Sequence, residues 1–284
     1  MQTQVKEFLA THAITQSMLA RSIGVSAAQV SQWLKGEYKG DVGGLEVKLA
    51  DFMRSYTVRG TDDNAIKVVR TADMKGAHFI ISEAIIGKEM AVVAGEAGCG
   101  KTTAVKEFVK NNPTTLLIEA IPGMSITSVL AQLCQLVGVS PSKNTEDMVL
   151  AIAKEFRRRE AVLIIDEAEN LTTKTLEAIR RIWDFSGVPT ILVGTHALFS
   201  NLKGRNGELL QLYSRIEGVW KFQGLGEEDL ESLFGEHAPV ISKITTHLRR
   251  ASNIYKKASR LARMENKPLS AAHIHQAASL MILG

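Results

Sequence analysis

The chain has 284 residues, with 34 Lys and Arg against 30 Asp and Glu. This length predicts about two domains, with a core large enough to fold without disulfides or metals. A content of 45% hydrophobic and 23% charged residues excludes a mainly disordered chain. The sequence has no long apolar run and no signal-peptide core, and its two cysteines, Cys99 and Cys134, cannot form a disulfide framework. These features favour a cytoplasmic protein without membrane contact.

Residues 1–56 predict a small helical domain that contains a helix-turn-helix. A helical pattern starts at Gln16, Gly24 ends it, and Ser26 N-caps a second helix over Ala27–Lys35. Small residues and amides on the exposed face of that helix suit the major groove of DNA; they are Ala28, Gln29, Ser31 and Gln32. The alternative is a helical protein-interaction domain, because seven basic and five acidic residues over 1–60 supply little charge for strong binding.

Residues 57–66 are polar and aperiodic, which predicts a linker. From residue 67 to residue 235, short apolar runs alternate with helical stretches such as Ser125–Val137 and Glu146–Arg159. This alternation favours an α/β fold with a buried parallel sheet. Strands are expected at Met90–Ala94, Thr115–Ile118, Ala161–Ile165 and Thr190–Val193, with a fifth at Val219–Phe222.

The sequence GEAGCGKT matches the P-loop pattern in full, between a strand-like and a helix-like stretch. Its glycines let backbone N–H groups turn around phosphate oxygens, and the following helix adds its positive dipole end. Lys101 is expected to reach the β- and γ-phosphates and Thr102 to bind Mg²⁺. The predicted nucleotide-binding residues are Gly95, Glu96, Ala97, Gly98, Cys99, Gly100, Lys101, Thr102, Thr103 and Asp166.

An apolar strand that ends in Asp166 and Glu167 strengthens this prediction. A P-loop NTPase needs a carboxylate at a strand end for the Mg²⁺ shell, and Asp166 suits that role. Glu167 would then orient or deprotonate the attacking water. Adjacent carboxylates are common on protein surfaces, but behind four apolar residues and together with a P-loop they indicate nucleotide hydrolysis.

Two further positions are candidates for sensing or stabilising the γ-phosphate. Thr195 follows an apolar strand and could hydrogen-bond the γ-phosphate or the lytic water, with His196 as the alternative and a structural turn as the plain reading. Arg215 lies between apolar neighbours and could act on the phosphate of a neighbouring subunit. Arg205 is the second candidate for that role, and a structural salt bridge is the plain reading of Arg215.

Residues 236–284 predict helices only, and eight Lys and Arg against two Glu give this segment a net charge of +6. A basic segment suggests a polyanionic partner. The alternative is a solvated helical face.

In their order, GEAGCGKT, LIIDEAE, LVGT and LYSRI resemble the motifs of AAA+ ATPases. The N-terminal helix-turn-helix and the phrase SRLARM in a basic helical tail narrow this resemblance. Nearly the whole chain resembles the transposition protein B family of Mu-like phages. Many NTPases share the P-loop and the acid pair, whereas the order of the modules and the stretch from Gly194 to Ile216 are more specific.

The resemblance implies an AAA+ core over residues 67–235 and a small helical lid over 236–284. It implies ATP and Mg²⁺ as cofactors, and self-association into a helical filament or ring on double-stranded DNA with little sequence preference. The DNA is presented to a DDE transposase in the bacterial host cell, and stimulated hydrolysis releases the protein. The roles carried over place Lys101 and Thr102 on phosphate and Mg²⁺, Asp166 and Glu167 on metal and water, Thr195 at the sensor position and Arg215 across the subunit interface.

The lid departs from the family at one position. AAA+ lids often carry an arginine that contacts the γ-phosphate, and the comparable phrase here runs from Ser252 to Lys256 with Tyr255 in the arginine's place. Either Lys256 substitutes for the arginine or the contact is absent, and slow basal hydrolysis is expected.

DNA contact in the core is expected from the helix-ending run Arg157, Arg158 and Arg159, although cations there also suit the helix dipole. Lys203 and Arg205 could line a central groove of an assembled ring or filament. Two other functions stay open. One is a helicase loader that binds a helicase and single-stranded DNA, and the other is a sequence-specific regulator in which the ATPase acts as a switch.

Overall fold

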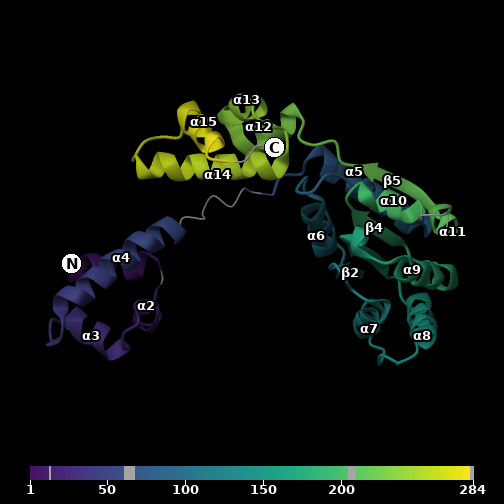
Figure 1. Ribbon diagram of the computed structural model, residues 1–284, viewed down its shortest axis with the longest axis horizontal. Helices are drawn as coiled ribbons and strands as arrows, with labels where there is room; N and C mark the ends of the chain where they lie inside the picture. The colour runs from purple at the N-terminus through teal and green to yellow at the C-terminus, as the bar shows by residue number, and fades with distance from the viewer. Residues whose placement is uncertain (13, 61–67, 204–208, 282–284) are drawn as a thin grey trace. The chain divides into compact units, whose positions relative to one another are not determined.

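The computed structural model describes residues 1–12, 14–60, 68–203 and 209–281 (Figure 1). The chain divides into two compact units, Met1–Lys67 and Val68–Gly284. Within the described residues, no helix combines the length and the apolar character needed to cross a membrane.

The first unit is entirely helical in its described residues, with α1 (Gln2–Thr11), α2 (Gln16–Ile23), α3 (Ala27–Lys35) and α4 (Val42–Gly60). The predicted bounds of α2 and α3 are confirmed. Gly24 ends α2 with a φ of 70°, and Ser26 forms a capping box with Gln29 at the start of α3. Val30 and Trp33 of α3 pack against Leu19 and Leu49 in one small core. Helix α4 extends four residues into the predicted linker, because no proline or glycine follows its first turn until Gly60.

The second unit contains a five-stranded parallel sheet in the order β2-β3-β4-β1-β5. The strands are β1 (Met90–Ala94), β2 (Thr115–Glu119), β3 (Val162–Asp166), β4 (Thr190–Gly194) and β5 (Ile216–Lys221). The α/β class and the first four strands are confirmed to within a residue. The fifth strand begins at Ile216 rather than Val219, because it is an edge strand whose residues alternate between half-buried and exposed and therefore lack a continuous apolar run.

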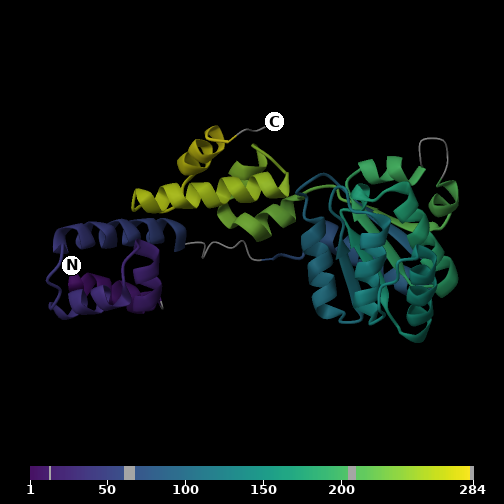
Figure 2. The same cartoon turned by 60° about the horizontal axis from the view of Figure 1, so that its bottom comes forward.

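Helices cover both faces of this sheet (Figure 2). Val92, Ile165 and Leu192 face α7 (Ile126–Val137), α8 (Thr145–Arg158) and α9 (Thr173–Ser186) in one core. Ala91 and Ile164 face α5 (Ala72–Gly87) and α6 (Lys101–Asn111) in the other. The short helices η2 (Ala168–Asn170), α10 (Ala197–Lys203) and α11 (Leu210–Tyr213) follow β3 and β4.

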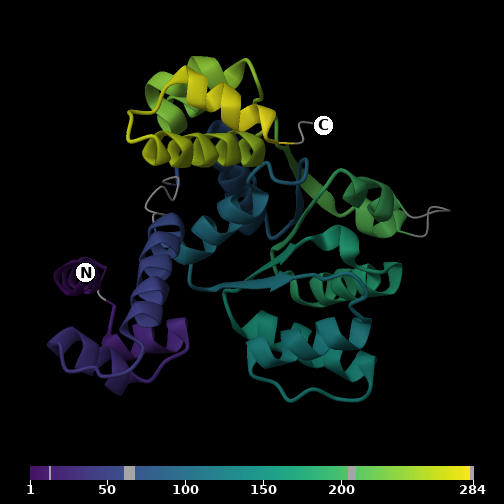
Figure 3. The same ribbon diagram turned by 60° about the vertical axis from the view of Figure 1, so that its left-hand side comes forward.

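The described residues after β5 form helices and their connections, as the sequence predicts (Figure 3). They are α12 (Glu227–Phe234), η3 (Gly235–His237), α13 (Ala238–Ser242), α14 (Leu248–Met264) and α15 (Ala271–Ser279). Helix α14 is strongly amphipathic, with Ala251, Ile254 and Ala258 buried.

A buried carboxylate in α5 fixes the segment that joins β5 to these helices. Asp73 is 4% exposed and accepts the N–H groups of Gln223 and Gly224 at 2.9 Å, and the indole N–H of Trp220 at 3.3 Å. Charge-assisted bonds of this kind are stronger than neutral ones. Asp73 thus sets where the sheet ends and the C-terminal helices begin.

We predict that Asp73→Ala lowers the free energy of unfolding by about 2–4 kcal/mol, because it leaves buried N–H groups without an acceptor. Urea unfolding followed by circular dichroism measures this change. The matched control is Glu83→Ala on the exposed side of the same helix, which should shift stability by less than about 0.5 kcal/mol. Equal effects of the two substitutions would contradict the anchoring role of Asp73.

Candidate nucleotide site

The P-loop connects the carboxyl end of β1 to the start of α6. Gly98 and Gly100 have φ values of 86° and 108°, a region that a residue with a side chain enters only with strain. Lys101 is 5% exposed, and its Nζ donates to the carbonyl oxygens of Gly95 and Glu96, both at 2.9 Å. The loop therefore wraps around its own ammonium group, whose third donor meets only the Cys99 Sγ at 3.9 Å, a weak acceptor.

The acid pair, Asp166 and Glu167, lies at the carboxyl end of β3. Asp166 is 2% exposed, and its Oδ1 accepts the N–H of Glu167 at 2.9 Å. Glu167 adopts a left-handed φ of 55°, which is uncommon for a residue with a side chain. Burial raises the pKa of Glu167, with the charges of Glu169 and Asp166 acting in the same direction and Lys101 opposing them. The acid pair and the P-loop therefore lie close enough for the charges of Glu167 and Lys101 to interact.

The sensor candidate also lies at this edge. Thr195 directly follows β4 and is half-buried, whereas His196 is exposed. The backbone N–H of Thr195 donates to Oε1 of Glu169 at 3.0 Å, which leaves its hydroxyl available for other partners. The sheet order explains the convergence, because β3, β4 and β1 are neighbours and the carboxyl ends of parallel strands meet at one edge.

The start of α14 lies on the P-loop, and sequence reasoning missed this contact. The backbone N–H of Arg249 donates to the carbonyl oxygen of Gly98 at 3.1 Å, and Nε2 of His247 lies 2.8 Å from the carbonyl oxygen of Ala97. A Cβ built on Gly98 would lie 2.8 Å from Nε of Arg249. The sequence feature that could have indicated this contact is the pair Arg249-Arg250 at the start of an amphipathic helix.

This geometry corrects the expected position of the lid arginine. Arg249 lies on the P-loop seven residues before Lys256, whereas the Tyr255 ring packs against Phe234 and His237 at centroid distances of 5.3 and 6.1 Å. An arginine of the C-terminal helices therefore does lie at the P-loop, and Tyr255 belongs to the packing of those helices. The prediction of slow basal hydrolysis was based on the absence of this arginine, and it no longer has that support.

The donor set at this edge fits a nucleoside triphosphate with Mg²⁺. The first N–H groups of α6 have no intrahelical partner, and with the Lys101 ammonium they suit phosphate oxygens. Thr102 and Asp166 supply the hard oxygen ligands that Mg²⁺ prefers. In the described part of the chain, no group of three or more His, Cys, Asp or Glu could hold a metal ion. Burial raises the pKa of the Cys99 thiol in the same loop, and Lys101 opposes this effect.

Arg215 lies away from the P-loop's own contacts and has partners within its chain. Its Nε lies 3.4 Å from Oδ1 of Asp184, and its guanidinium lies 5.8 Å from the Trp183 ring centroid. Asp184 also binds the buried Arg180. The Arg215 side chain is nevertheless 45% exposed, so the salt bridge and an approach to a second subunit are compatible. Arg205 lies outside the described residues.

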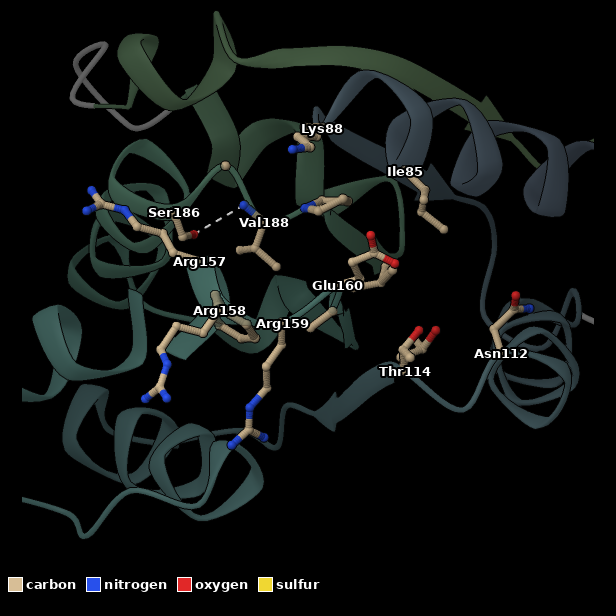
Figure 4. Close-up of a pocket in the computed structure, with 16 residues that line it drawn as sticks. Ile85, Lys88, Asn112, Thr114, Arg157, Arg158, Arg159, Glu160, Ser186 and Val188 are labelled. Atoms are coloured by element: carbon tan, nitrogen blue, oxygen red, sulfur yellow. Dashed lines mark hydrogen bonds between the residues drawn. The ribbon is translucent and has the colours of Figure 1, made fainter. Parts of the chain in front are cut away.

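The arginine run lies at the opposite edge of the sheet, around a pocket of about 630 Å³ (Figure 4). The pocket is lined by residues at the amino ends of β2, β3 and β4. Figure 4 shows Arg157, Arg158 and Arg159 fanned out along one side of it. Arg157 donates to the carbonyl oxygen of Phe185 and Arg159 to that of Val137, whereas Arg158 pairs with Glu155 at 3.1 Å and is 69% exposed.

The other DNA-contact candidates differ in how available their side chains are. Ala28 and Gln32 of α3 are exposed and Ser31 is half-buried. The Gln29 side chain is held by the capping box and by a 3.3 Å contact with the Tyr38 hydroxyl. Lys203, at the end of α10, lies 5.8 Å from the Tyr213 ring centroid.

Comparison with known proteins identifies the relatives of this arrangement. An AAA domain family matches residues 85–202. The Mu-like prophage FluMu DNA transposition protein B of Haemophilus influenzae is 29% identical over 236 residues, which cover 81% of this chain and 82% of that protein. The ATP-dependent target DNA activator B of Escherichia phage Mu is 26% identical over 206 residues, which cover 71% of this chain and 66% of that protein.

Among solved structures, the ORC2 protein of Aeropyrum pernix has a TM-score of 0.57 at 16% identity, over 74% of this chain and 68% of that one. At this identity the match shows the fold, which is that of a P-loop AAA protein. With the site geometry and the transposition relatives, it confirms the resemblance predicted from the motifs. The chain is an ATPase with a match to the AAA domain family over residues 85–202, and it is similar to the transposition B proteins of Mu-like phages.

Proposed function

We propose that this protein is an ATP-dependent, largely sequence-nonspecific DNA-binding ATPase that assembles on duplex target DNA and delivers it to a DDE transposase. Hydrolysis of ATP triggers its disassembly, in the cytoplasm of a bacterial host cell. The observation that carries the proposal is the convergence of Lys101, the acid pair and Thr195 at one edge of the sheet, under the start of α14. The printed names of the relatives supply the link to target DNA and transposition.

The proposed hydrolysis divides its work among the residues at this edge. The P-loop amides and Lys101 hold the β- and γ-phosphates, and Thr102 and Asp166 hold Mg²⁺, which when bound neutralises charge on phosphate oxygens. Glu167 orients the attacking water and accepts its proton, and its raised pKa makes it a better proton acceptor than an ordinary carboxylate. Thr195 donates its hydroxyl to the γ-phosphate. Arg249, placed on Gly98, takes the role of the lid arginine.

DNA binding is proposed to use three groups of residues with little sequence preference. The arginine run at the amino edge of the sheet and Lys203, together with Arg205, supply backbone contacts. The α3 face with Ala28, Ser31 and Gln32 supplies contacts from the first unit, to which Gln29 contributes less because its amide is already hydrogen-bonded. Because ATP is proposed to lie between subunits, nucleotide binding and assembly on DNA become one event.

The first test is duplex binding with ATP, with ADP and without nucleotide, on several unrelated sequences, with the products viewed by electron microscopy. We expect ATP-dependent filaments or rings on every sequence, and none with Lys101→Ala, because that variant loses the phosphate-holding ammonium. Nucleotide-independent binding to one sequence would instead identify a regulator. Binding to single strands but not to duplexes would identify a helicase loader.

A mixing experiment tests Arg215 as a residue that acts on a neighbouring subunit. Glu167→Gln and Arg215→Ala should each hydrolyse ATP at least about 10³-fold more slowly than the wild type. An equal mixture should recover about a quarter of the wild-type rate, because one interface in four then joins an intact Glu167 to an intact Arg215.

The control for this experiment is Asp184→Asn, which weakens the ion pair of Arg215 within its own chain. It should retain hydrolysis if the finger role holds. Loss of activity in Asp184→Asn, together with no recovery in the mixture, would assign Arg215 to a structural salt bridge.

Arg158 offers the cleanest test of the arginine run, because its neighbours Arg157 and Arg159 also hold backbone carbonyl groups. We predict that Arg158→Ala weakens duplex binding on all sequences and reduces the slope of log K against log salt by about 1, with ATP binding kept. Lys110→Ala is the matched control, since Lys110 is equally exposed and also pairs with a glutamate three residues earlier. Unchanged DNA affinity and slope in Arg158→Ala would remove this residue from the interface.

A further inference from the structure

Glu169 occupies a position that neither the P-loop nor the acid-pair motif explains. It lies in η2, three residues after Asp166, and its side chain reaches the end of β4 rather than the acid pair. Oε1 accepts the N–H of Thr195 at 3.0 Å. A Cβ on Gly194 would overlap Oε2, so the carboxylate lies directly on the backbone of this glycine.

The peptide group between Gly194 and Thr195 is held on both of its polar atoms. Its N–H donates to Glu169, and its carbonyl oxygen accepts the N–H of Gly95, the first P-loop residue, at 3.2 Å. A single peptide plane therefore joins the segment after the acid pair to the first residue of the P-loop. Because Thr195 belongs to this plane, the direction of its hydroxyl depends on the same two bonds.

The short helix that carries Glu169 is itself fixed from two sides. The Asn201 side chain of α10 donates to the Glu169 carbonyl oxygen at 2.8 Å, and the Asn170 side chain donates to the carbonyl oxygen of Ala120 at 3.1 Å. Side-chain hydrogen bonds thus tie η2 both to α10 and to the segment after β2. Flexible attachment would not hold a threonine to the sub-ångström accuracy that catalysis requires.

Stability alone does not account for this carboxylate. Within the part of the chain that the structure describes, Oε2 of Glu169 is buried and has no hydrogen-bond partner. A buried carboxylate oxygen without a partner is costly. Its placement beside the sensor threonine indicates that positioning, rather than folding, is what this residue serves.

We propose that Glu169 is a positioning residue for ATP hydrolysis, which clamps the Gly194–Thr195 peptide and so fixes Thr195 and the start of the P-loop relative to the acid pair. The inference rests on the proposed role of Thr195 at the γ-phosphate. Glu169 itself touches no reacting atom. Gly194 is part of the same device, because only a residue without a side chain leaves room for the carboxylate.

The test measures kcat, KM and ATP affinity of the full chain for Glu169→Ala, Glu169→Gln and Gly194→Ala. Glu169→Ala should lower kcat by about 10- to 100-fold, since small displacements of positioning groups cost rates of this order, with ATP affinity nearly unchanged. Glu169→Gln keeps an oxygen for the Thr195 N–H and should retain most of the wild-type kcat. A merely structural role would not separate kcat from affinity or be rescued by glutamine.

A double-mutant cycle sharpens the test. Gly194→Ala should lower kcat in the wild-type background, because its methyl group displaces the carboxylate, but should have little further effect in Glu169→Ala, where that space is free. The side chain of Leu198, 3.2 Å from the added methyl group, needs to shift by only a few tenths of an ångström. Equal losses in both backgrounds, or a wild-type kcat in Glu169→Ala, would overturn the clamp.

Thr195→Ala, measured in parallel, separates this inference from the function on which it rests. A wild-type kcat in Thr195→Ala would overturn the sensor role given under the proposed function. An impaired Thr195→Ala beside an unimpaired Glu169→Ala would overturn the clamp alone.

Discussion

The parallel pairing of β3, β4 and β1 is the constraint on which the rest of the site depends. Each strand ends in a different chemical group: the acid pair after β3, Thr195 after β4 and the P-loop after β1. Parallel pairing brings these ends to one edge, although the groups lie up to about a hundred residues apart in the chain. The two hydrophobic cores that cover the sheet hold this edge in register.

Several groups at this edge are held in unfavourable states that the surrounding fold must offset. Lys101 and Asp166 are almost fully buried, Glu167 combines a left-handed backbone with a raised pKa, and one oxygen of Glu169 is buried without a partner. A left-handed backbone at a residue with a side chain, or a buried oxygen without a partner, costs of order 1–3 kcal/mol. The concentration of these groups where the strands end, and not within the strands, is the pattern expected of a preorganised catalytic site.

The buried strands and the nucleotide motifs could be predicted from the sequence because both are local. A central parallel strand is a continuous apolar run, and the P-loop needs its glycines and its lysine at fixed spacing. The start of β5 could not be predicted in the same way, since an edge strand alternates in burial and resembles a loop in composition. The role of Glu169 was also out of reach, because the Thr195 N–H that it accepts lies 26 residues away.

The arginine at the P-loop lies at position 249, six residues before the position that the sequence motif indicates. The sequence around Asn253 and Tyr255 resembles a lid motif. The position where α14 begins, however, determines which of its residues contacts the P-loop. That start is fixed by His247, whose Nδ1 accepts the Arg250 N–H while its Nε2 lies against Ala97.

The same residue also ties the start of α14 to the P-loop. Its imidazole caps α14 through Nδ1 and places Nε2 2.8 Å from the carbonyl oxygen of Ala97 in the P-loop. Asp73 fixes the other end of the connection, where β5 leads into the C-terminal helices. The connection between β5 and α14 is therefore held at both of its ends, by Asp73 and by His247.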